Sequence, residues 1–419
     1  MSIDQFISSF SHADWLTTQP LGTIARQYGE SMQNERYSPL TIQHYLSALA
    51  HFNHWAASTP LAVSNIGATA IEAFIALHLP TCACTKPCFR GPLEIAAALA
   101  RMLKLLLSEH LVEAKPSVST PVSRELLEFK NYLANMCGLA VSTCSYRLRV
   151  VRLFITAQFG VGPIDLARLS PQHVEDWIIG LTNRYQPGSL GVIRSSLQSY
   201  FRYRAFRGDS TESLGAALPV LARRDEEKLI TTMTSAQLER FLASFDLKHP
   251  TGLRDFAMAR CLSDLGLRGQ EVTQLALDDV DWRAGTVTLH RTKDQRVRVL
   301  PLPVTAGAAI VEYLRKGRPR TSSRRLFVRQ IAPFDKPLGR HVVANVMNGA
   351  FARSGLGSQF SGTHVLRRTL ATRLQRCGCS LKAIADLLGH RELQTTTRYA
   401  KVEFERLRKI ALPWAGRQR

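Results

Sequence analysis

The chain has 419 residues, a length that predicts roughly two or three domains, and its hydrophobic fraction of 45% is enough for buried cores. Its 54 lysine and arginine residues against 33 acidic residues give a formal charge of +21. This favours a nucleic-acid partner over anionic lipid, because no basic amphipathic anchor is evident. No apolar run is long enough to span a membrane and the N-terminus lacks a secretory signal, so we expect a cytoplasmic protein with no membrane partner.

Apolar residues recur at helical spacing through the first part of the chain, residues 1–113. The segments TIQHYLSALAHFNHWA (41–56), IEAFIALHL (71–79) and LEIAAALARMLKLLLSEHL (93–111) are predicted helices. The stretch that follows, AKPSVSTPVS (114–123), is rich in proline, serine and threonine and is predicted to be a linker.

The eight cysteines do not form the pattern of a disulfide framework. Three of them lie in HLPTCACTKPC, where His78 precedes Cys82, Cys84 and Cys88. Three thiolates and one imidazole can hold a tetrahedral structural zinc ion, but this spacing differs from the usual paired C-x-x-C, so a reduced cysteine-rich loop is the alternative. The other five lie in helical stretches and are predicted to be small buried residues: Cys137, Cys144, Cys261, Cys377 and Cys379.

The second part, residues 119–222, is predicted to be a bundle of about four helices. The first runs from a cap at Ser123 to Gly138, and the others cover 141–159, 169–182 and 187–208. Arginines with aromatic residues between them indicate a surface that grips DNA phosphates, the alternative being solvated helix faces. These residues are Arg147, Arg149, Arg152, Arg194, Arg202, Arg204 and Arg207, with Tyr146, Tyr200, Tyr203 and Phe206. A charge-dense stretch at 222–230 is the second predicted linker.

The third part, residues 232–412, mixes helices with strands. Residues 278–303 alternate apolar and polar side chains across two turns, RAG and TKDQ, and predict a three-stranded antiparallel meander. Helical patterns precede and follow the meander, at 234–245, 251–266, 304–317, 339–355, 363–378, 380–389 and 392–402. The expected fold class is therefore mainly α with one small antiparallel β-sheet.

Arg268, in DLGLRGQEVTQL, lies between the end of one predicted helix and the start of the next. A guanidinium in such a place needs an anionic partner, because burying an unpaired charge is costly. Glu271 is three residues on and can orient the arginine from the same helix face. Taken alone, a structural Arg–Glu pair is the simpler interpretation.

Other polar residues follow along the same part of the chain. His364 and Arg367 are spaced i, i+3 near a helix N-terminus, where free N–H groups and the helix dipole favour an anion. Lys293 lies on the predicted turn between the second and third strands, where a lysine is ordinarily just solvated. His390 ends the LLG helix, which it can simply cap, and Tyr399 lies nine residues beyond it.

Together these residue types indicate one chemistry. Two arginines can offer paired donors to the non-bridging oxygens of a phosphate and neutralise charge in the transition state. A tyrosine hydroxyl beside them is a nucleophile for a covalent phosphoenzyme, while histidine and lysine exchange protons with the attacking and leaving oxygens. The sequence has neither a carboxylate cluster suited to Mg²⁺ nor a GxxxxGK[ST] loop for ATP, so no catalytic cofactor is expected.

The segments GLRGQEVTQL, TKDQRVRVLPL, HVLRRTLATRL, LLGH and RYA, in this order, resemble the tyrosine recombinase (phage integrase) family. The resemblance implies that Arg268 and Arg367 clamp the scissile phosphate. It also implies that His390 hydrogen-bonds this phosphate and that Tyr399 forms a 3′-phosphotyrosyl link.

The remaining catalytic roles also come from the resemblance. Lys293 would be the acid that protonates the leaving 5′ oxygen, and His364 would assist proton transfer. The enzyme would be a site-specific DNA recombinase, or integrase, that cleaves and rejoins strands without ATP or a catalytic metal ion. The reaction would serve integration or excision of a mobile element in a bacterial cell, where the protein would be associated with the nucleoid.

The resemblance also assigns the parts of the chain. Residues 119–222 would be a helical, SAM-like core-binding domain and 232–412 a mixed α/β catalytic domain, which together would clamp double-stranded DNA. Residues 1–113 would be an extended N-terminal DNA-binding or accessory region that contains the cysteine cluster, and 413–419 a C-terminal tail. The family implies a homotetramer on two synapsed recombination sites, alone or with related recombinases.

Two other functions would use much of the same sequence. A nicking-and-closing enzyme resembling type IB topoisomerases would share almost the whole site but would not need paired DNA sites. A DNA-binding regulator descended from a recombinase would have no need of Tyr399. The apolar residues after this tyrosine, in EFERLRKIALPWAG, are expected to dock either on a neighbouring protomer or on their own domain.

Overall fold

In the computed structural model, contacts between Cα atoms divide the chain into two compact units, residues 106–226 and residues 1–105 with 227–419. The expected middle part lies within the first unit, whereas the division into three parts stays a prediction. The described residues are 3, 7, 13–59, 61–84, 91–112, 120–160, 162–219, 231–290, 297–339 and 341–389. No helix within this described part of the chain combines the length and the hydrophobicity that crossing a lipid bilayer requires.

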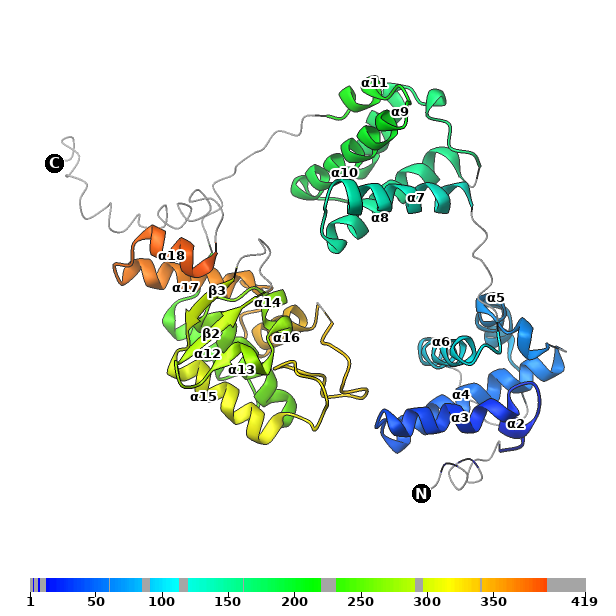
Figure 1. Ribbon diagram of the computed structural model, residues 1–419, viewed down its shortest axis with the longest axis horizontal. Coiled ribbons are helices and arrows are strands. Elements are labelled where there is room, and N and C mark those ends of the chain that lie inside the picture. Colours follow the sequence, from blue (N-terminus) through cyan, green and yellow to red (C-terminus); the bar gives the residue numbers. More distant parts are fainter. Residues whose placement is uncertain are drawn as a thin grey trace, which may run out of the picture. The chain divides into compact units, whose positions relative to one another are not determined.

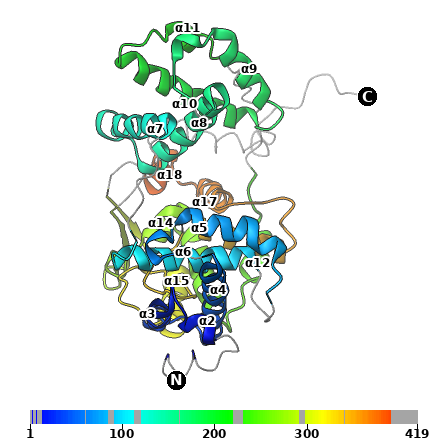
Figure 2. The same cartoon turned by 90° about the vertical axis from the view of Figure 1, so that its right-hand side faces the viewer.

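Every secondary-structure element among the described residues of the N-terminal stretch is a helix, as the sequence predicts. Helices α2, α3 and α4 pack side by side (Figure 2). The amide of Asn53, a buried residue of α4, joins them by donating to the Trp15 carbonyl at 2.7 Å and accepting the Leu21 N–H at 3.0 Å. The elements are α2 (Ala13–Thr17), α3 (Gly22–Asn34), α4 (Pro39–Ser58), η1 (Val63–Asn65), α5 (Ala68–Ala73), η2 (Phe74–His78), η3 (Leu79–Thr81) and α6 (Pro92–Ser108).

The unit of residues 106–226 is a helical bundle around one apolar core (Figure 1). The predicted cap at Ser123 is wrong by three residues. Thr120 caps the first helix instead, because Pro121 takes the first helical position and the Thr120 hydroxyl accepts the Ser123 N–H at 3.1 Å. The elements are α7 (Pro121–Asn131), η4 (Tyr132–Met136), α8 (Val141–Phe159), η5 (Leu166–Arg168), α9 (Pro171–Leu181), α10 (Pro187–Phe206) and α11 (Glu212–Ala216).

The C-terminal stretch contains the predicted meander, a three-stranded antiparallel sheet in the order β1-β2-β3. Val287 pairs with both Val280 and Leu300, and all three side chains are buried against the helices. The elements are α12 (Ser235–Leu242), α13 (Pro250–Asp264), α14 (Gly269–Gln274), η6 (Leu277–Asp279), β1 (Val280–Asp281), β2 (Thr286–Leu289), β3 (Arg298–Pro301), α15 (Val304–Glu312), η7 (Tyr313–Gly317), α16 (Val342–Arg353), α17 (His364–Arg376) and α18 (Leu381–Leu388). The expected class, mainly α with a small antiparallel sheet, is confirmed.

Helix α13 forms the centre of this domain and packs against α15, α16 and α17. Its Cys261 is fully buried, as predicted for the scattered cysteines, and Cys144 of α8 is also buried. The same prediction is wrong for Cys137, Cys377 and Cys379, which are exposed. Each of these three lies just beyond a helix end, where helical periodicity no longer determines burial.

Candidate active site

Arg268 and Glu271 form the expected ion pair at the start of α14. The Arg268 Nη1 donates to Glu271 Oε1 at 2.8 Å, and the Arg268 backbone N–H donates to Oε2 at 2.8 Å. The carboxylate thereby satisfies an N–H group that the first turn of a helix leaves without an intrahelical acceptor. The Glu271 side chain is only 4% exposed, so its charge is held in a poorly solvated place.

A second arginine, Arg298 of β3, binds the same carboxylate and was not predicted from the sequence. Its Nη2 donates to Glu271 Oε1 at 3.1 Å, and its Nη1 donates to the backbone carbonyl of Leu387 at 2.8 Å. The sequence does contain a signal for it. Val297 and Val299 point to solvent whereas Leu300 is buried, so Arg298 occupies an inward-facing position of an alternating strand.

Arg367, in the first turns of α17, is almost completely buried, with 4% of its surface exposed. Its two Nη atoms donate to the backbone carbonyls of Gly266 and Leu388. These contacts connect three segments that are far apart in the sequence: the end of α13, the start of α17 and the end of α18.

The C-terminus of α18 is held by three arginines at once. A helix leaves its last carbonyl groups without intrahelical donors, and these carry the negative end of the helix dipole. Here the last carbonyls before residue 390 each accept a hydrogen bond from a different guanidinium. The pairs are Arg298 with Leu387, Arg367 with Leu388, and Arg268 with Gly389.

Two glycines allow this close packing. Gly389 ends α18 in the left-handed conformation, with φ of 61°, and a Cβ atom there would lie 2.9 Å from Arg298 Nη1. Gly266, with φ of 65°, lies where a Cβ would come within 2.7 Å of Leu388 and 2.9 Å of Leu370. A Cβ atom at either glycine would have to displace these side chains, and the left-handed backbone would be strained as well.

His364 lies on the same helix as Arg367, and three further predicted residues lie outside the described residues. His364 is exposed and begins α17. The start of α17 lies against the start of α14. A Cβ atom added to Gly269 of α14 would lie 3.4 Å from Cγ2 of Thr363, the residue before His364. Those outside the described residues are Lys293, His390 and Tyr399.

Of the seven arginines predicted to grip DNA, Arg147 and Arg194 are half-buried. Arg149, Arg152 and Arg202 are exposed on α8 and α10 and keep that role as a prediction. Arg204 instead forms ion pairs within its own domain, at 3.1 Å to Glu125 and 2.6 Å to Asp209.

Other members of the predicted surface also have partners inside the bundle. Arg207 pairs with Glu128 but its side chain is 46% exposed, so its contact with DNA stays a prediction. Tyr200 and Tyr203 are buried in the core, contrary to the prediction, because they lie on the apolar face of α10. Burial, with Glu125 adding to the effect, raises the pKa of the Tyr200 hydroxyl far above its ordinary value. Phe206, by contrast, is exposed.

The predicted metal ligands lie in the N-terminal stretch. His78, Cys82 and Cys84 come together with a fourth side chain, His51, which the sequence did not single out. Cys88, the fourth ligand predicted from the sequence, lies outside the described residues.

Comparison with known proteins identifies the family. Residues 231–406 match the model of the phage integrase family. A candidate integrase/recombinase of Sinorhizobium fredii, y4rA, is 32% identical over 97% of this chain and 98% of the relative. The tyrosine recombinase XerD of Listeria monocytogenes serotype 4b is 30% identical over 68% of this chain and 95% of the relative.

Solved structures share the fold. The XerH site-specific recombinase bound to palindromic difH substrate gives a TM-score of 0.54 at 17% identity, over 84% of this chain and 96% of XerH. A lambda integrase fragment bound as a dimer to a COC′ core site gives 0.52 at 18% identity, over 71% of this chain and 96% of the fragment. With the full-length match to y4rA and the match to XerD, these findings show that the chain belongs to the phage integrase family, the tyrosine-type site-specific DNA recombinases.

Proposed function

We propose that this protein cleaves a DNA strand by attack of Tyr399 on the scissile phosphate and rejoins the 3′-phosphotyrosyl end to a new 5′ hydroxyl. The observation that carries the proposal is the arginine cluster. Arg268 and Arg367, the two arginines expected to clamp the phosphate, both bind the chain just before His390.

The charge of the cluster suits the transition state better than the ground state. Arg268, Arg298 and Arg367 with the single carboxylate of Glu271 carry a formal net charge of +2. A phosphodiester has one negative charge, whereas the five-coordinate phosphorus formed by tyrosinate attack has about two. Charged groups that are fixed in a poorly solvated place, and whose net charge matches that of the five-coordinate phosphorus, lower the barrier of the chemical step.

The step conserves atoms and charge without ATP or a catalytic metal ion. The Tyr399 Oη–P bond forms as the P–O5′ bond breaks. His364 takes up the tyrosine proton and Lys293 gives a proton to the leaving 5′ oxygen, while His390 hydrogen-bonds a non-bridging oxygen. The energy of the phosphodiester stays in the phosphotyrosine, so the reverse step on a different 5′ hydroxyl completes strand exchange.

The DNA partner and the assembly belong to the same proposal. Exposed Arg149, Arg152 and Arg202 would contact phosphates of a double-stranded recombination site. The relative y4rA is named an integrase/recombinase, which supports DNA integration or excision. The mobile element and the bacterial nucleoid are further parts of the proposal. Exchange between two sites requires four active subunits, so the expected assembly is a homotetramer on two synapsed sites.

A nicked suicide substrate tests the mechanism. A duplex made from the end of the DNA element that carries the gene is nicked next to the cleavage position. After cleavage, the short fragment that carries the freed 5′ hydroxyl diffuses away. Its loss prevents religation and traps the covalent intermediate. The control is Tyr185→Phe, because Tyr185 is a half-buried tyrosine outside the proposed site. We expect a denaturation-resistant protein–DNA adduct with wild type and with this control, in the presence of EDTA, and none with Tyr399→Phe. An equal yield from Tyr399→Phe would contradict the assignment.

A second assay separates recombination from nicking and closing. One supercoiled plasmid carries two copies of the element end, and a matched plasmid carries none. A recombinase produces exchanged products from the first plasmid alone. Relaxation of both plasmids at equal rates, without exchange, would instead assign a topoisomerase-like activity.

A further inference from the structure

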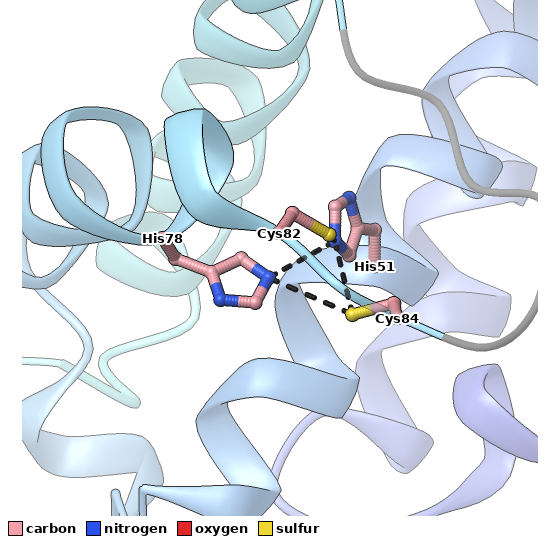
Figure 3. Close-up of side chains that lie close together, drawn as sticks. All are labelled: His51, His78, Cys82 and Cys84. Carbon is pink, nitrogen blue, oxygen red and sulfur yellow. Dashed lines mark hydrogen bonds between the residues drawn. The ribbon is translucent and has the colours of Figure 1, made fainter.

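Four metal-binding side chains from two separate segments converge in the N-terminal stretch (Figure 3). His51 lies in α4, and His78 ends the π-helical turn η2. Cys82 and Cys84 follow in the loop after η3. Their ligand atoms all lie within 4.8 Å of one another, and none of these side chains takes part in the proposed recombination chemistry.

Four of the six distances between these atoms are close to the edges of a metal-centred tetrahedron. Zinc bonds of about 2.05 Å to nitrogen and 2.3 Å to sulfur give tetrahedral edges of about 3.3 Å for N–N and about 3.6 Å for N–S. The two Nε2 atoms of His51 and His78 are 3.1 Å apart. The Cys82 and Cys84 sulfurs lie 3.3 and 3.6 Å from the His51 Nε2, and the Cys84 sulfur lies 3.7 Å from the His78 Nε2.

One hydrogen bond at the His51 Nε2 cannot satisfy all of these neighbours at once. The Nε2 of a neutral imidazole carries either one proton or one lone pair. The Nε2 of His51 has three neighbours at 3.1, 3.3 and 3.6 Å, and it can satisfy one of them well. A single cation at the centre satisfies all four groups through their lone pairs.

Aromatic packing fixes the two imidazoles. His51 is fully buried and its ring meets the ring of Phe74 edge-on, with centroids 5.1 Å apart. His78 stacks on the same phenylalanine at 5.1 Å and 19°, with Trp55 on another side. The two nitrogen ligands are therefore held in place by groups that do not bind metal, as supporting residues do in metal sites.

We propose that His51, His78, Cys82 and Cys84 bind one structural Zn²⁺ ion that fastens the 78–84 segment onto α4. Two imidazoles and two thiolates in a tetrahedron are typical of zinc, and four protein ligands close the site to substrate. The site replaces Cys88 of the sequence-based set with His51. It is independent of the proposed recombination chemistry.

Metal analysis of the purified full-length protein tests the site. We expect one zinc ion per chain in wild type and a loss of at least about tenfold in zinc content for His51→Gln and Cys84→Ser. Cys379→Ser, an exposed cysteine of the catalytic domain, and Cys88→Ser should keep the full content. Wild-type protein without bound zinc would overturn the proposal. So would a Cys88→Ser protein that loses zinc together with a His51→Gln protein that keeps it, because that result would favour the sequence-based ligand set.

Cobalt substitution gives a readout that does not depend on variants that fold poorly. Wild-type protein refilled with Co²⁺ should show the intense d–d absorption of a tetrahedral site together with thiolate-to-cobalt charge transfer. X-ray absorption at the zinc edge should fit two sulfur and two nitrogen ligands. The weak spectrum of octahedral cobalt, or a shell of oxygen and nitrogen alone, would contradict the assigned ligands.

Discussion

Replacing Glu271 with glutamine keeps the shape of the side chain and removes the charge that Arg268 and Arg298 share. In the wild type Oε1 accepts from both guanidinium groups, at 2.8 and 3.1 Å, and Oε2 accepts the Arg268 backbone N–H at 2.8 Å. A glutamine has one carbonyl oxygen and one NH₂ group. In either amide orientation, the NH₂ therefore faces a donor.

The size of the effect follows from burial. Removing one partner of a buried ion pair costs about 3–5 kcal/mol, and the Glu271 side chain is only 4% exposed. We expect the lower end, about 3 kcal/mol, because part of the hydrogen bonding survives. Displacement of Arg268 by about 1 Å would slow cleavage by about a hundredfold.

Urea unfolding of the full chain, hydrogen exchange of residues 266–276 and single-turnover adduct formation measure these effects. Glu312→Gln is the matched control, because Glu312 is 43% exposed and pairs with Lys316 on the surface of α15. Its loss should change the unfolding free energy by less than about 0.5 kcal/mol. The reasoning would be refuted by a Glu271→Gln protein that matches this control in stability and exchange, or that cleaves within about twofold of wild type.

Gly389→Ala should lower the free energy of unfolding by about 2–3 kcal/mol and slow adduct formation, because alanine is strained at φ of 61° and its Cβ would press on Arg298. The control is Gly355→Ala, with φ of 68° and open space around it, which should lose only about 1–2 kcal/mol in the same thermal unfolding assay. Equal losses would show that contact with Arg298 is unimportant. Arg202→Gln should weaken DNA binding, lower the salt dependence of the binding constant by about one counterion and leave the stability unchanged. Arg204→Gln should instead destabilise the bundle by about 3 kcal/mol, because it breaks a buried ion pair. A binding defect without loss of stability in Arg204→Gln would reverse these assignments.

Local sequence patterns predicted most elements, because apolar residues recur about every 3.6 residues in a helix and every second residue in a strand. The helix at 141–159 has the predicted bounds, and the alternation in 278–303 predicted the meander with its order. The Arg268–Glu271 pair was also accessible, since both residues lie within one helical turn. These features depend on neighbours in the sequence.

The features that the sequence did not reveal depend on tertiary contacts. Arg298 joins the site through a carbonyl 89 residues away, and His51 meets ligands 27 to 33 residues away. The sequence around Tyr200, with arginines and other aromatic residues nearby, does not distinguish a buried tyrosine from one that faces DNA. Only the packing of the helices shows that Tyr200 is buried. A single sequence gives no distances between such segments.

The most direct test of the central claim is to identify the residue that carries DNA in the trapped adduct. A glutamate-specific protease should release residues 393–403, LQTTTRYAKVE, which contain one tyrosine. After nuclease digestion, mass spectrometry should find a 3′-linked nucleotide remnant on Tyr399. A remnant on any other residue, or on no peptide of a confirmed adduct, would contradict the account.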